Sequence, residues 1–285
     1  MASLEKLREA VPEGKFVPID CDLQDFASVR KAVKEIKAKG YTSIYCLANN
    51  AGILAVPDEI TKADGFDKQV QTNYLSHFLL TRELFPLIVA ASKDYGDARI
   101  VQHSSHSRHW TPNQCLEEKY FLKQERDGML GGNDRKWFIH GGPWYRYYQS
   151  KLATSVFAQC LHDKLLASEN EDIKNILSLS AHPGTCDTNI FDNHKPKGYV
   201  MSQYIEPLVR SIFQSAEDGS MGMLKGMMDD RENVIGGTLY GPVSYFISMK
   251  GPAVENPPMP YETDPDSKEM LWRTSEKAIG VSFEI

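Results

Sequence analysis

Short apolar segments alternate with long segments of helical periodicity along this sequence, and the alternation limits the fold more than any other feature. Strands are expected at 16–19, 44–48, 99–103, 173–181 and, as a short edge strand, 236–240. Helices are expected at 25–39, 66–91, 147–166 and 266–279, after a short helix and turn at 1–15. Strands and helices in this order predict right-handed crossovers and an open, doubly wound parallel sheet of the α/β class.

Two segments depart from this alternation. Residues 106–146 are rich in Trp, His, Gly and charge and show no clean period. An irregular stretch of this length inside a compact domain is usually functional, for example as a lid over a pocket. Residues 251–265 contain five prolines and predict an extended surface arm with little regular structure. We therefore expect one domain over 1–285, with a long insertion at about 106–146 and a Pro-rich C-terminal arm at about 251–265.

The charge and the cysteine pattern exclude several classes of function. The chain has 285 residues and a formal net charge of −6, which argues against nucleic acid or an anionic membrane as the main partner. We see no apolar run approaching the roughly 18 residues that span a bilayer, and no signal peptide. Five separated cysteines without a Cys-x-x-Cys pair favour reduced thiols and a cytoplasmic protein over a disulfide framework or a zinc site.

Polar motifs follow three of the predicted strands directly. Asn49-Asn50-Ala51-Gly52, Ser104-Ser105 and His182-Pro183-Gly184 stand where those strands end. In an open parallel sheet, ligands bind at the carboxyl ends of the strands, so these motifs are expected to share one site. Each has a simpler interpretation as a turn, a helix cap or a loop, but three in succession favour a ligand site.

Tyr147 and Lys151 lie four residues apart on a predicted helix, so their side chains share one face. An ammonium group beside a phenol favours the phenolate, and we expect Lys151 to lower the pKa of Tyr147 from about 10 towards neutrality. A tyrosine with such a pKa can exchange a proton with an alcohol or a carbonyl near physiological pH. The alternative is a solvated surface pair without function.

Together these motifs resemble the short-chain dehydrogenase/reductase family. The matching elements, in the order of the family, are Asp22-Leu23, Asn49-Asn50-Ala51-Gly52, Thr72-Asn73, Ser104-Ser105, Tyr147-x-x-x-Lys151 and Pro183-Gly184-x-x-x-Thr188. Several flanking segments look like the branch of retinol dehydrogenases, WW-domain oxidoreductases and protochlorophyllide reductases. The resemblance implies a Rossmann-like fold and an oxidoreductase that interconverts an alcohol and a carbonyl with NADP or NAD.

The resemblance also implies a role for each catalytic position. Tyr147 would be the general acid or base, and Lys151 would lower its pKa and bind the nicotinamide ribose. Ser105 would hydrogen-bond the substrate oxygen, and the family pattern prefers it to Ser104, as it prefers Tyr147 to Tyr148. Asn73 would hold a water that connects Lys151 to solvent.

Further positions are implied to bind the cofactor. Asp22 and Leu23 would face the adenine, and Asn49, Asn50, Ala51 and Gly52 would face the adenosine side. Pro183, Gly184, Thr185 and Thr188 would contact the nicotinamide amide.

One element of the family pattern is not found. The family begins with a strand, a glycine-rich turn that binds the pyrophosphate, a helix and a second strand, and only 1–15 precedes the predicted strand at 16–19. We therefore expect an N-terminally truncated sheet without its first βαβ unit, and the residue that separates NAD from NADP is absent. The alternative function is a cofactor-deficient, inactive fragment or a protein-binding module.

Three further expectations complete the sequence prediction. Even spacing of His103, His106 and His109 suggests a metal site, but a strand end and loop favour incidental histidines, so no metal ligands are predicted. Aromatic side chains in 106–146 either line an apolar substrate pocket or pack on themselves. The oligomeric state is not read from the residues; the resemblance alone implies a homodimer, because the family often pairs through the helices that carry Asn73 and Lys151.

Overall fold

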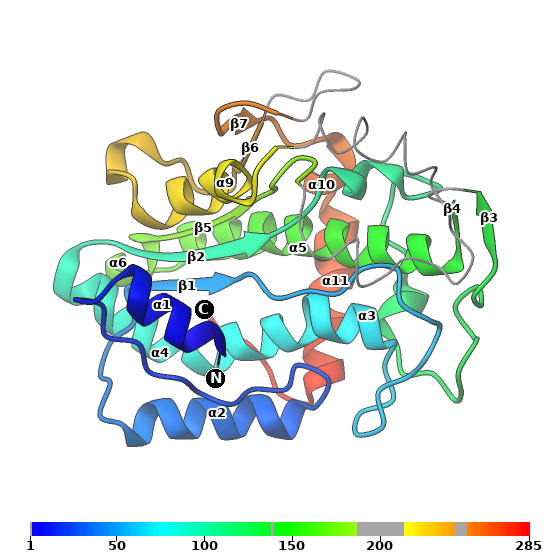
Figure 1. Cartoon of the computed structure of the whole chain (residues 1–285), viewed down its shortest axis with the longest axis horizontal. Coiled ribbons are helices and arrows are strands. Elements are labelled where there is room, and N and C mark those ends of the chain that lie inside the picture. Colours follow the sequence, from blue (N-terminus) through cyan, green and yellow to red (C-terminus); the bar gives the residue numbers. More distant parts are fainter. Residues whose placement is uncertain (1, 138–139, 187–213, 243–249) are drawn as a thin grey trace.

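The computed structural model describes residues 2–137, 140–186, 214–242 and 250–285, and its centre is a five-stranded sheet (Figure 1). The strand order is β1-β2-β5-β6-β7. The strands are β1 (Cys46–Asn49), β2 (Ala98–His103), β5 (Ile176–Ala181), β6 (Leu239–Gly241) and β7 (Val254–Asn256). The first four run parallel and β7 runs antiparallel to β6. This confirms the predicted α/β class with a parallel, Rossmann-like sheet.

The register of the parallel strands brings their carboxyl ends to one edge. Asn49 pairs with Gln102, and His103 pairs with Ala181. The loops after β1, β2 and β5 therefore begin side by side, as the polar motifs require. All six residues of β5 are buried, Ser178 and Ser180 included, so both faces of this strand are covered.

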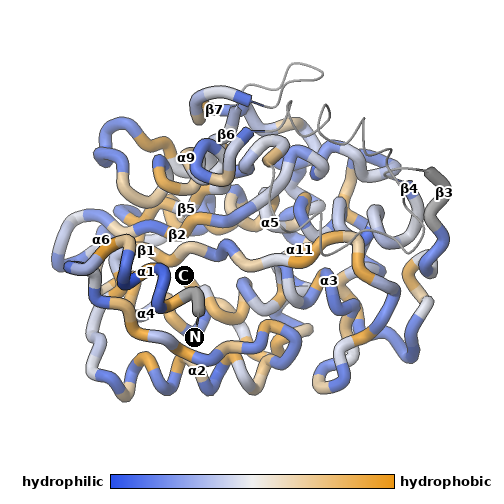
Figure 2. The backbone as a smooth tube through the Cα atoms, in the orientation of Figure 1, coloured by the Kyte–Doolittle hydropathy of each residue, from blue (hydrophilic) through white to orange (hydrophobic). Residues whose placement is uncertain are grey.

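One face of the sheet is covered by α4 (Ser76–Tyr95) and α5 (Gly142–Ala167), and α2 (Phe26–Ala38) packs outside α4. Asp25 caps α2 by accepting the Ala27 N–H at 2.8 Å, and Val29 and Val33 are buried beneath it. Figure 2 shows the alternation of apolar and polar residues along this helix. The helix predicted at 25–39 is confirmed, as are those at 66–91 and 147–166.

The opposite face is covered by α9 (Ala216–Met228), which lies above the strands in Figure 1. Glycine at 226 makes the close approach to the sheet feasible, because a Cβ there would come within 2.5 Å of Leu179 Cδ1. Helices thus cover both faces, as an open α/β sheet requires.

The C-terminal segment closes the structure over α4 and α5. It consists of α10 (Pro260–Thr263), α11 (Pro265–Ile279) and the last residues of the chain. Trp272 stacks on Phe283 with ring centroids 5.1 Å apart, and both rings contact Phe78 of α4. This packing covers part of the surface through which the resemblance implies pairing, and the homodimer stays a prediction.

Three details of the predicted strands are wrong, and so is one of the predicted Pro-rich arm. The segment 16–19 is not a strand, and Val17 is 46% exposed, because no described residue offers a pairing partner at the outer edge of β1. Before β5, Asn170 caps a short helix, α6 (Glu171–Lys174), so the strand starts three residues later than predicted. The short strand near 236–240 is present as β6 but is not the edge, because β7 pairs outside it. The Pro-rich arm, predicted to have little regular structure, contains both β7 and α10.

The insertion is more ordered than its composition suggested. It contains two 3-10 helices, η2 (His106–Trp110) and η3 (Glu118–Phe121), and a hairpin of β3 (Arg135–Trp137) and β4 (His140–Gly141). Tyr120 and Phe121 are buried in the main core, so much of the segment packs on the domain.

One stretch of helix, Lys68–Tyr95, is long and apolar enough to cross a membrane by length and composition, with a mean hydropathy of 1.2. Of this apolar window, 61% is buried inside the fold, and a buried core helix can have the same length and composition as a membrane span. The stretch comprises α3 (Lys68–Val70), a π-helical turn η1 (Gln71–Leu75) and α4.

Candidate active site

Tyr147 lies in the second turn of α5, where its hydroxyl meets two serines of the loop after β2. The Ser105 and Ser107 side chains are the hydrogen-bonding groups that act on the phenol, and both lower its pKa. Ser107 Oγ in turn donates to Ser105 Oγ at 2.9 Å, and Ser105 caps η2 by accepting the Ser107 N–H at 3.2 Å. Three hydroxyl groups are therefore connected at the carboxyl end of β2.

Lys151 lies one turn further along α5, on the same face. Its Nζ is 5.9 Å from the centroid of the Tyr147 ring and donates to the carbonyl oxygen of His103 at 2.8 Å. The side chain is 5% exposed, and burial lowers the pKa of its ammonium group to about 8.

Asn73 connects the loop after β1 to α5 from within the π-helical turn η1. Its Oδ1 accepts the N–H of Ile53 at 2.7 Å, and its Nδ2 donates to Ile53 O and to Ser150 Oγ, both at 2.9 Å. π-Helical turns inside helices occur frequently at functional sites, and this one places the amide against the site. The water relay implied for Asn73 stays a prediction.

Gly52 allows these groups to converge. A Cβ at this position would stand 3.1 Å from Asn73 Oδ1 and 3.4 Å from Lys151 Nζ. The loop after β1 therefore passes so close to both side chains that only a hydrogen fits without a shift.

Ser104 and Tyr148, the alternatives to Ser105 and Tyr147, make different contacts. Ser104 is 1% exposed and donates its hydroxyl to the backbone oxygen of Lys151 at 2.7 Å, which fixes α5 against β2. Tyr148 packs its ring against Trp110 and Trp144. Ser105 and Tyr147 are thus the pair whose hydroxyl groups meet.

The predicted lowering of the Tyr147 pKa is wrong for this structure. Burial raises the pKa of the phenol to about 12, although the hydrogen bonds with Ser105 and Ser107 act in the opposite direction. Lys151 directs its proton to His103 O and stands above the ring rather than beside the hydroxyl. Desolvation of the phenolate is therefore the dominant effect, and Tyr147 keeps its proton.

The motif after β1 forms a hydrogen-bonded turn rather than a row of free side chains. Asn49 is 2% exposed, and its Nδ2 donates to Thr81 Oγ1 at 2.9 Å while its Oδ1 is buried without a partner. Asn50 Oδ1 is 2.5 Å from His103 Nδ1, and the carbonyl oxygen of Ala51 is 2.9 Å from His77 Nε2. Only Asn50 and Ala51 of this motif are exposed.

The other predicted cofactor positions lie around the same edge of the sheet. The backbone oxygen of Leu23 accepts a hydrogen bond from the Ser76 hydroxyl at 2.6 Å, which places residues 22–23 near the start of α4. After β5, the carbonyl oxygen of Pro183 accepts from Cys186 Sγ at 2.8 Å, and that of Thr185 accepts from Gln214 N at 2.9 Å. Gly184 donates to His182 Nδ1 at 3.1 Å, and Thr188 lies outside the described residues.

The residues fit one half of a dinucleotide. Gly52 leaves room for close approach beside the buried ammonium of Lys151, which donates a hydrogen bond to His103 O. These groups suit a ribose with its hydroxyls next to Tyr147. No residue described before Cys46 belongs to a strand, so that part of the structure shows no glycine-rich strand-to-helix turn for a pyrophosphate.

A buried arginine next to Tyr147, which no sequence motif indicated, anchors the insertion. Arg146 is fully buried, with its Nε 3.1 Å from Asp67 Oδ2 and its Nη1 3.3 Å from Asp58 Oδ2. Its Nη groups also donate to the oxygens of Leu130 at 3.2 Å, Gly132 at 3.0 Å and Val56 at 3.0 Å. No local pattern marks this residue, because its partners come from distant loops. Ser107 was also not predicted as a site residue, although its position two residues after Ser105 could have indicated it.

The histidines of the loop after β2 pair with other groups. His109 Nδ1 is hydrogen-bonded to the Tyr261 hydroxyl, and the ring of His106 lies 5.1 Å from that of His109. Within the described ranges, no group of three His, Cys, Asp or Glu side chains is arranged to hold a metal ion.

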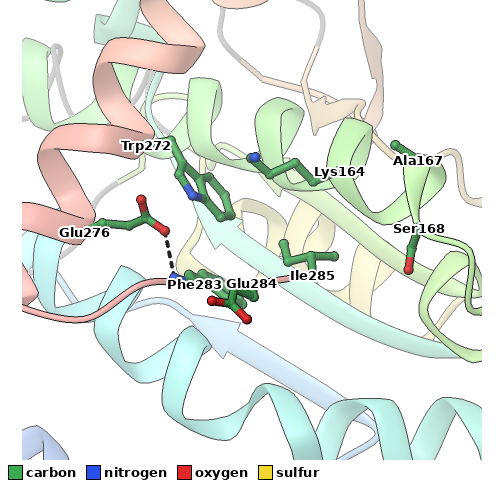
Figure 3. Close-up of a pocket in the computed structure, with 8 residues that line it drawn as sticks. All are labelled: Lys164, Ala167, Ser168, Trp272, Glu276, Phe283, Glu284 and Ile285. Atoms are coloured by element: carbon green, nitrogen blue, oxygen red, sulfur yellow. Dashed lines mark hydrogen bonds between the residues drawn. The ribbon is translucent and has the colours of Figure 1, made fainter.

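A surface depression of about 500 Å³ lies elsewhere, at the C-terminal end of α5 (Figure 3). Lys164, Trp272 and Ile285 are among its lining residues. Lys164 follows Lys151 by 13 positions on the helix, or roughly 20 Å at 1.5 Å per residue. The depression therefore does not belong to the site around Tyr147.

The fold and the site define a class of Rossmann-type protein with a Ser-Tyr-Lys centre, and comparison with known proteins agrees. Residues 1–113 match the sequence profile of the short chain dehydrogenases. The chain is 30% identical over 226 residues to the short-chain dehydrogenase/reductase drtF of Aspergillus calidoustus, covering 77% of this chain and 65% of that one. It is 27% identical over 282 residues to polyprenol dehydrogenase of Danio rerio, covering 99% and 76%.

A solved structure supports the same assignment. An uncharacterised protein from Mycobacterium paratuberculosis superposes with a TM-score of 0.64 at 26% identity, covering 93% of this chain and 76% of that one. Together, the profile match and these relatives support membership of the short-chain dehydrogenase/reductase family. It spans less than two thirds of the length of the drtF relative.

Proposed function

We propose that this chain carries the catalytic centre of an oxidoreductase that interconverts an alcohol and a carbonyl with NAD or NADP. The observation that supports this most directly is the interaction of the Tyr147 and Ser105 hydroxyls, with the buried ammonium of Lys151 over the Tyr147 ring. A nicotinamide cofactor, when bound, supplies hydride exchange with the substrate carbon.

The chain's own residues would handle the proton and the substrate oxygen. Tyr147, whose pKa burial holds at about 12, keeps its proton and donates it to the oxygen of a carbonyl substrate. Ser105 would orient that oxygen and stabilise the charge that develops on it. In the reverse direction the phenolate must form, and an ammonium group moved towards the hydroxyl would favour it. Lys151 lies one turn from Tyr147 on α5, so its ammonium group is near enough to take this role.

An apolar substrate is the second part of the proposal. Leu54 and Ala55 form a cluster with Tyr147 and Tyr148, and Trp144 packs against it. Trp110, on the loop that carries Ser105, is 39% exposed and packs edge-on against Tyr148. One relative is named for a polyprenol, so a long isoprenoid alcohol is the first substrate to test. Membership of the retinol dehydrogenase-like branch and a cytoplasmic location stay predictions.

Turnover tests the proposal. We expect residues 1–285 to oxidise an isoprenoid alcohol or reduce its aldehyde, and Tyr147→Phe to reduce kcat by about 10²- to 10⁴-fold, the usual size of general acid–base catalysis. Binding of the cofactor, followed by NADPH fluorescence, should be retained in Tyr147→Phe. Activity equal to that of the unsubstituted chain would sink the assignment of Tyr147.

A second candidate is a cofactor-deficient protein-binding module. It is favoured by the lack of a strand in the part of the structure described before β1. The NADPH titration separates the two candidates, because micromolar binding by the unsubstituted chain contradicts the second. No binding of NADPH or NADH up to millimolar concentration contradicts the first.

A further inference from the structure

A buried carboxylate from the C-terminal arm lies behind the catalytic loop. Glu262, in α10, is 1% exposed. Its Oε1 accepts from Arg108 Nε at 2.8 Å and from Ser155 Oγ at 2.5 Å, and its Oε2 accepts the Met259 N–H at 2.8 Å. Both oxygens of the carboxylate are therefore used inside the protein.

Arg108 carries this interaction to Ser105. It is 2% exposed and lies in η2, three residues after Ser105, where its Nη1 donates to the Ser105 carbonyl oxygen at 3.3 Å. The guanidinium thus connects Glu262 to the backbone of the residue whose side chain meets Tyr147.

The same carboxylate also contacts the helix of Tyr147. Ser155, its third partner, lies one turn after Lys151 on α5. A second link runs alongside, from His109 of η2 to the Tyr261 hydroxyl. The loop of Ser105, the helix of Tyr147 and the C-terminal arm therefore meet at one charged group.

Stability alone does not account for this arrangement. Taking a carboxylate and a guanidinium out of water is expensive, and apolar residues of similar volume often replace such a pair without loss of stability. A charge-assisted pair does fix geometry, and η2 is a single short 3-10 turn with little rigidity of its own.

We propose that Glu262, acting through Arg108, is a positioning residue that holds the Ser105 hydroxyl against that of Tyr147. The catalytic consequence rests on the proposed function, whereas the geometric consequence does not. Glu262 touches neither Tyr147 nor Lys151, and its effect is indirect.

Nuclear magnetic resonance of the full chain with ¹³Cζ-labelled tyrosine tests the geometry without turnover. The Tyr147 signal is identified by its loss in Tyr147→Phe, and Ser105→Ala supplies the position of the signal when the serine is absent. We expect Glu262→Gln to move the Tyr147 signal at least half of the way to that position.

Two further variants make the test decisive. Glu262→Gln leaves Arg108 buried without its partner and can unfold the protein. The double variant Arg108→Met with Glu262→Leu replaces both charges by apolar side chains, so we expect it to stay folded. Glu118→Gln is the matched control, because it breaks an exposed pair with Arg273, whose N···O distance is 3.1 Å. A Tyr147 signal that stays at its original position in the double variant, as it should in Glu118→Gln, would overturn the proposal.

Kinetics supply the catalytic readout in the same proteins. We expect kcat to fall about 10- to 100-fold in the double variant, as for a small misplacement of a catalytic group, while the KM of the cofactor changes less than twofold. An unchanged kcat despite a shifted Tyr147 signal would refute the catalytic consequence. Inactivity of the unsubstituted chain would count against the proposed function, and the signal of Tyr147 would still decide the positioning role.

Discussion

Replacement of Arg146 by methionine tests whether the insertion is held by a buried charge. The guanidinium is fully buried and faces two carboxylates, at 3.1 Å for Asp67 and 3.3 Å for Asp58, which are 1% and 4% exposed. Methionine fills much of the volume but leaves both carboxylates without their cation. Three carbonyl oxygens also lose a donor.

The size of the effect follows from these contacts. Removing one partner of a buried ion pair costs about 3–5 kcal/mol. Asp58 keeps the N–H groups of Leu130 and Gly132, and Asp67 keeps those of Gln69 and Val70, which limits the loss. We expect a decrease of about 4 kcal/mol in the free energy of unfolding, a large part of the roughly 5–15 kcal/mol that stabilises a typical domain.

Urea denaturation followed by tryptophan fluorescence measures this change. With an m value of about 2–3 kcal/mol/M, the midpoint should fall by about 1–2 M at unchanged m. Arg273→Met is the control, because its pair with Glu118 is 62% and 45% exposed and should contribute less than about 1 kcal/mol. Equal midpoints for the two variants would refute the reasoning, because they would mean that Arg146 is solvated in solution.

Two other predictions follow from single positions. Gly52→Ala places a Cβ 3.1 Å from Asn73 Oδ1, so we expect a loss of about 1–3 kcal/mol, seen as a fall of a few degrees in Tm, and an unchanged Tm would contradict the close approach. Burial lowers the pKa of His77 from 6.5 to about 4, so its contribution to stability is full above pH 6.5 and is lost as the pH falls towards 4. His77→Gln removes this titration. Between pH 6.5 and 5, the free energy of unfolding measured with urea should fall by about 2 kcal/mol more in the unsubstituted chain than in the variant. Equal decreases in the two proteins would refute the assignment.

Local patterns predicted the helices and the parallel strands well, because their causes are local. The Asp25 cap and the stripe of Val29 and Val33 specify α2 within its own sequence. The strand at 16–19 failed because an apolar run becomes a strand only when a neighbour completes its hydrogen bonds, and that depends on the rest of the sheet. The start of β5 failed because the cap of Asn170 diverts the preceding residues into α6.

The site shows the same division. Helical spacing placed Tyr147 and Lys151 on one face, and strand ends placed Gly52 and Ser105 near them. The sequence could not predict that Lys151 directs its proton to His103 O, or that burial raises the pKa of Tyr147. Both depend on how deeply α5 is buried and on which groups lie beside it.

The sequence by itself indicated the family, the order of the elements and the candidate catalytic residues, because periodicity and motif spacing act over a few positions. Only the tertiary structure decided the charge state of Tyr147 and the partners of its loop. Arg108 and Glu262 are separated by 154 positions, and Ser155 and Glu262 by 107. Contacts over such distances follow from the packing of the whole domain, and no local pattern records them.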